Sequence, residues 1–330
     1  MTRHLAGHLA RLLGGLGSIA TTGRAMGGGQ SGVASDTRCE PSAALRTRLA
    51  RAKVNLFLHL RGQREDGYHL LESLVVFPEI GDRLSLEPGS PLGLTLDGPF
   101  AADVPRDGRN LVLAAAARLA EATGIDRPQG TVMLIKNLPV ASGIGGGSAD
   151  AAAALTLCAE AWGVAVPKAL SLALGADVPV CSAAPRPTMM AGIGEHLTPG
   201  PALPEAWLVL VNPRQPVSTP DVFRATTEKT GPAGPAAPAE GFADAAALAG
   251  WLAAARNDLE PAAIALCPAI AEVLTALEDA LLARMSGSGA TCFGLYPNET
   301  HALAAAARLS AAQPGWWVAT GRLSPMHPAE

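Results

Sequence analysis

The sequence predicts an α+β fold of two domains, with a boundary near residue 200. Segments typical of strands and of helices are mixed along the chain without the regular alternation of a doubly wound sheet. The chain has 330 residues, more than the roughly 250–300 that one core supports, and 48% of them are hydrophobic. We expect one domain over 49–200 and a second over 201–330. An extension over 1–48, expected to be disordered, precedes them.

Apolar runs and period-two alternation predict the strands. The segment AKVNLFLHL at 52–60 has the apolar density of a buried strand, and 70–77 returns beside it after the turn at Asp66-Gly67. Alternating apolar residues at 83–87 and 92–97 predict two more strands. Further strands are expected at 131–137, 188–195, 206–212 and 316–323, and one directly after the glycine-rich segment 285–290.

Alanine-rich segments that end at glycine or proline predict the helices. The segment 110–124 ends in a glycine, which is typical of a helix C-terminus. Helices are expected at 110–124, 148–163, 168–175, 243–255, 258–283 and 298–311, with an interruption at Pro268 in the fifth. The segment 231–241 is rich in proline and alanine and is expected to be a mobile loop without a function.

Charge and cysteine content exclude several classes of protein. The net charge of −4 opposes broad binding to nucleic acid, and no apolar run reaches the ~18 residues of a membrane span. The five cysteines lack the spacing of a zinc site and indicate a reducing compartment. Residues 1–35 carry arginines and no acid, as a targeting peptide would, but Arg11 interrupts their apolar run. We expect a cytoplasmic protein without nucleic-acid or membrane partners, either a monomer or a weak homodimer.

The segment from Gly143 to Ser148 carries the strongest functional signal. Four of its first five residues are glycine, and an alanine-rich helix follows at once. Glycines expose backbone N–H groups, and a helix N-terminus adds unpaired N–H groups and the positive end of a dipole. A plain strand–helix turn needs only one or two glycines. The pattern therefore predicts a phosphate-binding loop.

Common phosphate-binding motifs do not describe this loop. The G-x-x-x-x-G-K-[ST] pattern is absent, and Ser148 stands where a dinucleotide-binding fingerprint has its third glycine. The HRD and DFG signatures of protein kinases are also missing. The loop instead lies in the longer pattern P-x-x-x-G-I-G-G-G-S-A-D, from Pro139 to Asp150.

This longer pattern resembles the ATP loop of the GHMP kinases, a family named for galactokinase, homoserine kinase, mevalonate kinase and phosphomevalonate kinase. Separate segments resemble other motifs of that family: AKVNLFL from 52, DGYH from 66, LGADVPV from 174 and MSGSGA from 285. The resemblance covers about residues 50–325. It implies an ATP-binding domain like the second domain of ribosomal protein S5, followed by a ferredoxin-like domain, with the active site between them.

The resemblance also implies roles for single residues. Asp177 would be the base that accepts a hydroxyl proton, and Lys53 would stabilise the developing negative charge and keep Asp177 ionised. The ATP-binding residues would be Asn110, Lys136, Pro139, Val140, Ala141, Ser142, Gly143, Ile144, Gly145, Gly146, Gly147, Ser148 and Ala149. Mg²⁺ would arrive bound to ATP, because no set of protein ligands for it is evident in the sequence.

The DGYH segment indicates an alcohol substrate that carries a cytidine nucleotide. Tyr68 would stack on the cytosine, and His69 would hydrogen-bond its edge. The resemblance to the family implies that Phe223 forms the other side of the stack. Asn55 would contact the sugar-alcohol portion. Ala149 departs from the family pattern, because a serine is common at this position.

Three alternatives remain open at this stage. The first is another small-molecule kinase of the family, of the homoserine or mevalonate type, but its substrate would have no base to stack on Tyr68. An oxidoreductase that uses a dinucleotide, or a non-catalytic RNA-binding module, would leave Lys53 and Asp177 unexplained as a pair.

Overall fold

The structure is a computed structural model that describes residues 46–323. These residues belong to one compact unit, Leu45–Glu330. The first 45 residues of the expected extension, with Cys39, lie outside the described residues. Residues 46–48 already belong to a strand, although the sequence predicts that they belong to the extension.

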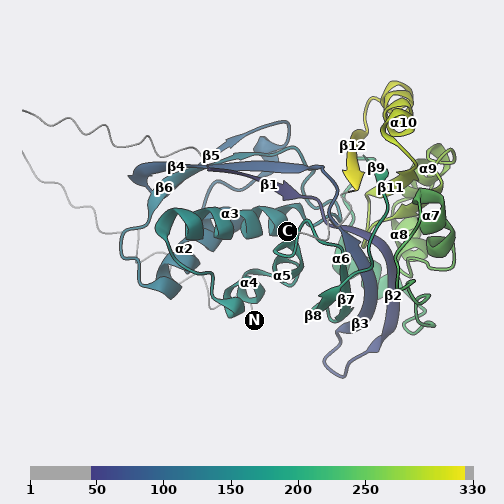
Figure 1. Cartoon of the computed structure of the whole chain (residues 1–330), viewed down its shortest axis with the longest axis horizontal. Helices are drawn as coiled ribbons and strands as arrows, with labels where there is room; N and C mark the ends of the chain where they lie inside the picture. The colour runs from purple at the N-terminus through teal and green to yellow at the C-terminus, as the bar shows by residue number, and fades with distance from the viewer. Residues whose placement is uncertain (1–45, 324–330) are drawn as a thin grey trace, which may run out of the picture. The chain divides into compact units, whose positions relative to one another are not determined.

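One four-stranded sheet forms the centre of the first part of the described chain (Figure 1). It pairs β1 (Arg46–Arg51), β4 (Gly81–Pro91), β6 (Gln129–Ile135) and β5 (Gly93–Asp97) in that order. The short helix η1 (Ala101–Asp103) follows β5, and α2 (Leu111–Thr123) and α3 (Gly146–Trp162) pack along one face of the sheet. Gly124 ends α2 with φ +73°, a backbone angle that favours glycine.

A second sheet extends from this part. It pairs β2 (Val54–Gln63), β3 (His69–Val76), β7 (Thr188–Gly192) and β8 (His196–Pro199) in that order. Residues 54–60 are buried without exception, as their apolar run predicts. The register between β2 and β3 shifts between Asn55 and Phe57, and such irregularities often accompany functional sites.

The third sheet confirms the ferredoxin-like domain. Its strands, in the order β10-β11-β9-β12, are β10 (Leu282–Met285), β11 (Cys292–Tyr296), β9 (Ala206–Asn212) and β12 (Trp317–Leu323). All neighbours are antiparallel, and the chain runs strand, helices, two strands, helix, strand. The helices are α6 (Thr219–Ala225), α7 (Ala245–Ala253), α8 (Glu260–Leu266), α9 (Ala269–Ala276) and α10 (Glu299–Ala312).

The two parts share a core across the predicted boundary. Ala52, Val54 and Leu56 of the first part pack in one buried cluster with Phe293 and Leu323 of the second. The boundary near 200 falls between β8 and β9, so it separates the sheets although the core continues through it.

Several local predictions were wrong. Residues 282–283 begin β10 instead of ending a helix, and the strand β8 was not expected. The short helix α5 (Val178–Cys181), which follows α4 (Lys168–Leu174) after a turn at 176–177, was also not expected. The interruption at Pro268 is confirmed, because α8 and α9 end and begin beside it.

The proline-rich loop 231–241 is tied to its surroundings. Gly231 N–H donates to Leu60 O, Gly234 N–H donates to Glu72 Oε2, and Trp251 Nε1 donates to Ala236 O. These hydrogen bonds hold the loop along the outer edge of β2, which the sequence did not indicate.

Candidate active site

A cavity of about 240 Å³ opens beside the glycine-rich loop. Seven residues of the predicted ATP site line it: Asn110, Lys136, Pro139, Val140, Ala141, Gly146 and Gly147. Asn110 also caps α2, because its Oδ1 accepts from Val112 N–H at 2.8 Å and its Nδ2 donates to Pro105 O at 2.8 Å. The helix cap therefore fixes one wall of the cavity.

Buried residues anchor the first glycine-rich loop on the side that faces the protein interior. Ile144 is fully buried, and its carbonyl accepts from Lys53 N–H at 2.8 Å. Ser142 Oγ donates to Pro139 O at 2.7 Å, and Ala149 packs in the core beneath the first sheet. The side chains of Ser142, Ile144 and Ala149 thus face the protein and not the cavity. Their place in the predicted ATP site rests on the backbone alone.

Helix α3 begins at Gly146, two residues before the expected start. Its first N–H groups have no acceptor within the helix, as at every helix N-terminus. Gly145 has φ +64°, and a Cβ there would lie 3.1 Å from Cβ of Lys53. Glycine therefore lets the loop approach the short connection between β1 and β2, which carries Lys53.

Lys136 forms a buried charge cluster with two carboxylates. Its Nζ lies 2.5 Å from Asp82 Oδ2 and 2.7 Å from Asp150 Oδ2, and all three side chains are at most 5% exposed. Burial alone would lower the pKa of Lys136, but the two carboxylates outweigh it and raise the pKa. Burial raises the pKa of Asp150, and the Asp82 charge adds to this effect while Lys136 opposes it. Lys136 therefore stays charged and supports the base of the cavity.

The predicted catalytic pair meets directly. Lys53 Nζ donates to Asp177 Oδ1 at 2.9 Å, although 124 residues separate them. The Lys53 side chain is 8% exposed and that of Asp177 is 40% exposed, so the carboxylate reaches solvent while the ammonium group stays beneath it. Asp177 directly precedes α5. A carboxylate that pairs with a buried cation on one side and is accessible on the other can accept a proton from a bound hydroxyl group.

The predicted base-binding residues form two groups. His69 and Phe223 stack on each other, with ring centroids 5.0 Å apart and planes at 28°. Tyr68 is 61% exposed beside them at the tip of the β2–β3 hairpin. Burial, then the charge of Lys229, lowers the pKa of His69. The ring is therefore neutral near pH 7, and its buried Nδ1 has no partner within 46–323.

Asn55 joins the first part of the chain to the second glycine-rich loop, residues 285–291. Its N–H donates to Ser286 Oγ at 3.0 Å, and its Nδ2 donates to Ser73 Oγ at 2.7 Å. Asn55 Oδ1 is buried and has no partner among the described residues. This oxygen is therefore an unused hydrogen-bond acceptor inside the described part of the protein.

Comparison with known proteins agrees with this geometry. The families described as "GHMP kinases N terminal domain" and "GHMP kinases C terminal" match residues 110–184 and 236–315. A 4-diphosphocytidyl-2-C-methyl-D-erythritol kinase of Paramagnetospirillum magneticum is 55% identical over 282 residues, 83% of this chain and 97% of its own. A Cereibacter sphaeroides protein of the same name is 55% identical over 280 residues, 83% and 98% of the two chains. The chain belongs to the GHMP kinase family.

Solved structures place the chain within the GHMP kinases in the same way. A crystal structure of 4-(cytidine 5'-diphospho)-2C-methyl-D-erythritol kinase matches with a TM-score of 0.71 and 37% identity, over 85% of this chain and all of that one. A mevalonate kinase of L. major matches with a TM-score of 0.60 at 15% identity, over 87% of this chain and 99% of its own, and shows the common fold alone. These findings confirm the resemblance and decide against the oxidoreductase and the RNA-binding module.

Several residues of this GHMP kinase site were missed by the sequence reasoning. Asp150 and Asp82 are buried against Lys136, and Arg109 lines the cavity beside the glycine-rich loop. Asp150 lies in the alanine-rich helix just after the loop. An acidic residue among so many apolar ones was the sequence signal that could have identified it. Nothing local marked Asp82, because its partner lies 54 residues away.

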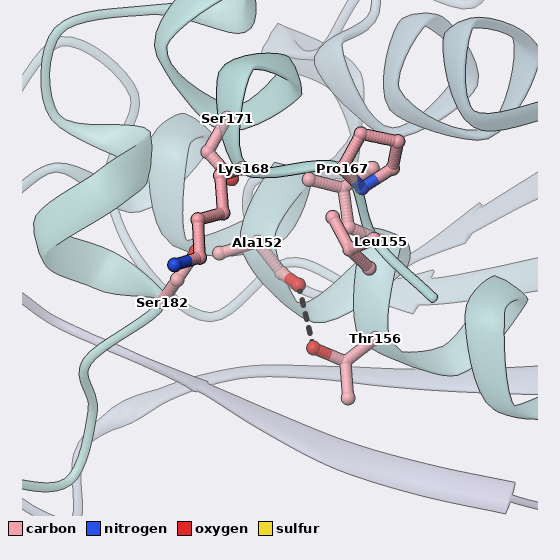
Figure 2. Close-up of a pocket in the computed structure, with 8 residues that line it drawn as sticks. Ala152, Leu155, Thr156, Pro167, Lys168, Ser171 and Ser182 are labelled. Atoms are coloured by element: carbon pink, nitrogen blue, oxygen red, sulfur yellow. Dashed lines mark hydrogen bonds between the residues drawn. The ribbon is translucent and has the colours of Figure 1, made fainter. Parts of the chain in front are cut away.

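A second cavity of about 220 Å³ lies between α3, α4 and α5 of this GHMP kinase (Figure 2). Apolar side chains of α3 and Pro167 form part of its wall, and Lys168 extends toward Ser182. No motif predicted it.

Within 46–323, no group of three or more His, Cys, Asp or Glu side chains could hold a metal ion, and no helix is long and apolar enough to cross a membrane. The four cysteines in this range are free and buried.

Proposed function

We propose that the chain transfers the γ-phosphoryl group of ATP to the 2-hydroxyl of 4-diphosphocytidyl-2-C-methyl-D-erythritol, a step of the non-mevalonate isoprenoid pathway. The products are ADP and the 2-phosphate. The observation that carries the proposal is the contact of Lys53 with Asp177, directly connected to the glycine-rich loop through Lys53 N–H and Ile144 O. The relatives named for this kinase and their identity to this chain support the choice of substrate.

Asp177 is the base of the proposed reaction. It accepts the hydroxyl proton as the oxygen bonds to the γ-phosphorus and the bond to the ADP oxygen breaks. Lys53 lies beside the carboxylate and stabilises the negative charge that develops on the phosphoryl oxygens. Its buried position favours this role, because a charge acts more strongly where water is excluded.

The cytosine binds at His69, Phe223 and Tyr68. A neutral His69 has one ring nitrogen that donates and one that accepts, which suits the mixed donors and acceptors on the edge of cytosine. Exposed Tyr68 closes on the base, and Phe223 supplies the opposite aromatic face. Asn55 Oδ1, which lacks a partner among the described residues, accepts from a hydroxyl of the methylerythritol portion. A homoserine or mevalonate substrate would leave these groups unpaired, which disfavours that alternative.

ATP occupies the cavity beside Asn110 and Lys136, and the N–H groups at the start of α3 cradle its phosphates. Mg²⁺ enters with the nucleotide and supplies positive charge at the phosphates. The free cysteines support a reducing, cytoplasmic setting. We further propose that the protein acts as a monomer or a weak homodimer.

The test measures ADP release from Mg·ATP with the cytidine substrate. Homoserine, mevalonate and galactose are assayed separately as alternative acceptors. Asp177→Asn should lower kcat by about 10²–10⁴-fold. Asp244→Asn is the matched control, because Asp244 is exposed and caps α7, a role that asparagine also fills. Turnover with another acceptor alone, or full activity of Asp177→Asn, would refute the proposal.

A further inference from the structure

The segment 257–260, which leads into α8, holds the second glycine-rich loop from behind. Asn257 Nδ2 donates to Met285 O and to Gly287 O, each at 2.8 Å. Glu260 Oε2 accepts from Met285 N–H at 2.8 Å. Asn257 is 6% exposed, so both of its carbonyl partners are shielded from water on that side. The loop would lose buried hydrogen bonds if this amide were removed.

The orientation of the Asn257 amide is determined by its neighbours. Its Oδ1 accepts from Leu259 N–H at 3.0 Å, so its nitrogen must face the loop. The following residue fastens the segment to β2: Asp258 N–H donates to Leu58 O at 2.9 Å, and Asp258 Oδ2 accepts from Leu60 N–H at 2.7 Å. The support is therefore rigidly connected to the strand that carries Asn55.

The front of the loop contacts the candidate active site at three places. Thr291 N–H and Oγ1 both donate to Ser142 O, at 3.3 and 2.6 Å, which links it to the ATP loop. Ser286 Oγ accepts from Asn55 N–H at 3.0 Å. Ser288 Oγ lies 2.7 Å from Thr219 Oγ1, at the start of the helix that carries Phe223. One loop thus contacts the elements proposed to bind both substrates.

The loop has few contacts that could fix its shape from within. Ser286 N–H donates to Thr291 O and Gly289 N–H donates to Ser286 O. Gly287 has φ +57°, and its carbonyl is one of the two that Asn257 holds. The Asn257 amide therefore donates to the loop at Gly287, the residue whose backbone has a left-handed φ.

We propose that Asn257 is a positioning residue for phosphoryl transfer: its amide sets the position of the 285–291 loop against the ATP loop and the cytidine-binding helix together. This inference rests on the proposed function. It assigns no contact with substrate to Asn257 itself. Glu260 assists by fixing Met285, the residue from which the loop departs.

The test replaces the donating amide by a carboxylate of nearly the same size, Asn257→Asp. The carboxylate can still accept from Leu259 N–H but cannot donate to the loop. Asn298→Asp is the matched control, because Asn298 is exposed and caps α10 by accepting from His301 N–H. We expect kcat of Asn257→Asp to fall by about 10²-fold and the Kd for Mg·ATP to rise, whereas Asn298→Asp keeps both values within about twofold.

A purely structural role would lower the melting temperature of Asn257→Asp and leave kcat, KM and the Kd for Mg·ATP of the folded protein unchanged. That result would overturn the proposal. If Asn257→Asp does not fold, Glu260→Ala and Glu260→Gln replace it. Glutamine keeps an acceptor for Met285 N–H and should restore most of the activity that alanine loses, and equal activity of the two variants would overturn the inference.

The two proposals fail in distinguishable ways. Absence of turnover by the unmodified chain with the cytidine substrate refutes the proposed function. The Kd for Mg·ATP of Asn257→Asp against Asn298→Asp still tests the position of the loop, and equal values refute it.

Discussion

The close approach of the two glycine-rich loops predicts a large effect of a single methyl group at Gly143. A Cβ at this position would lie 2.3 Å from Gly289 O and 2.9 Å from Gly289 C. Both are backbone atoms, so one loop must move. The residue also has φ +78°, where any other residue is strained.

Two contributions give the magnitude for Gly143→Ala. The left-handed backbone costs about 1–2 kcal/mol for alanine. Displacing a packed neighbour costs about 1–3 kcal/mol more. The free energy of unfolding should therefore fall by about 2–5 kcal/mol, and kcat should fall by about 10²-fold because the loops no longer meet in their native geometry.

Gly124→Ala separates the two contributions. Gly124 has φ +73°, and no atom lies within 4 Å of the place that a Cβ would take there, so its replacement carries the backbone strain without the clash. Urea unfolding and steady-state kinetics of both variants provide the comparison. Equal losses of stability in the two variants, together with unchanged kcat in Gly143→Ala, would refute the close approach of the loops.

Three further predictions concern buried or stacked side chains. Burial and then the charge of Arg256 lower the pKa of His59, so neutral His59 stabilises the fold above pH 6.5 and this contribution is lost as the pH falls below it. Between pH 7 and 5, the free energy of unfolding should fall more steeply for the unmodified chain than for His59→Gln. Equal slopes would contradict this. Lys136→Met leaves two buried carboxylates without their cation and should cost about 3–5 kcal/mol in urea unfolding. Exposed Lys168→Met serves as its control and should change stability by no more than about 0.5 kcal/mol. Phe223→Ala should raise KM for the cytidine substrate by about 5–150-fold, the equivalent of 1–3 kcal/mol of base stacking, with KM for ATP unchanged; a parallel rise in KM for ATP would argue against a role in base binding.

Much of the fold could be predicted because its signals are local. The buried strand β2 follows from the density of apolar residues at 52–60, and the glycine-rich loop follows from composition. The short strand β8 and helix α5 carry too few residues for a periodic pattern, so only their tertiary surroundings define them.

The site shows the same division between local and distant causes. Lys53 and Asp177 each have an ordinary structural explanation, and the resemblance to a family paired them before the structure did. The roles of Asp82 and Asn257 depend on partners 54 and about 30 residues away, which no local pattern encodes. The segment 231–241 looked free because composition does not reveal hydrogen bonds from β2 and β3.

The last strand has a consequence for how the protein is made. Arg322 O accepts from Glu79 N–H at 2.9 Å, and Trp317 Nε1 donates to Asn137 O, directly before the residues that lead into the ATP loop. Leu323 lies in the same buried cluster as Ala52 and Val54, which flank Lys53. During synthesis, the ribosome exposes every residue of the ATP loop long before it releases β12. The nascent chain therefore acquires a fully supported Lys53 only after β12 has left the ribosome.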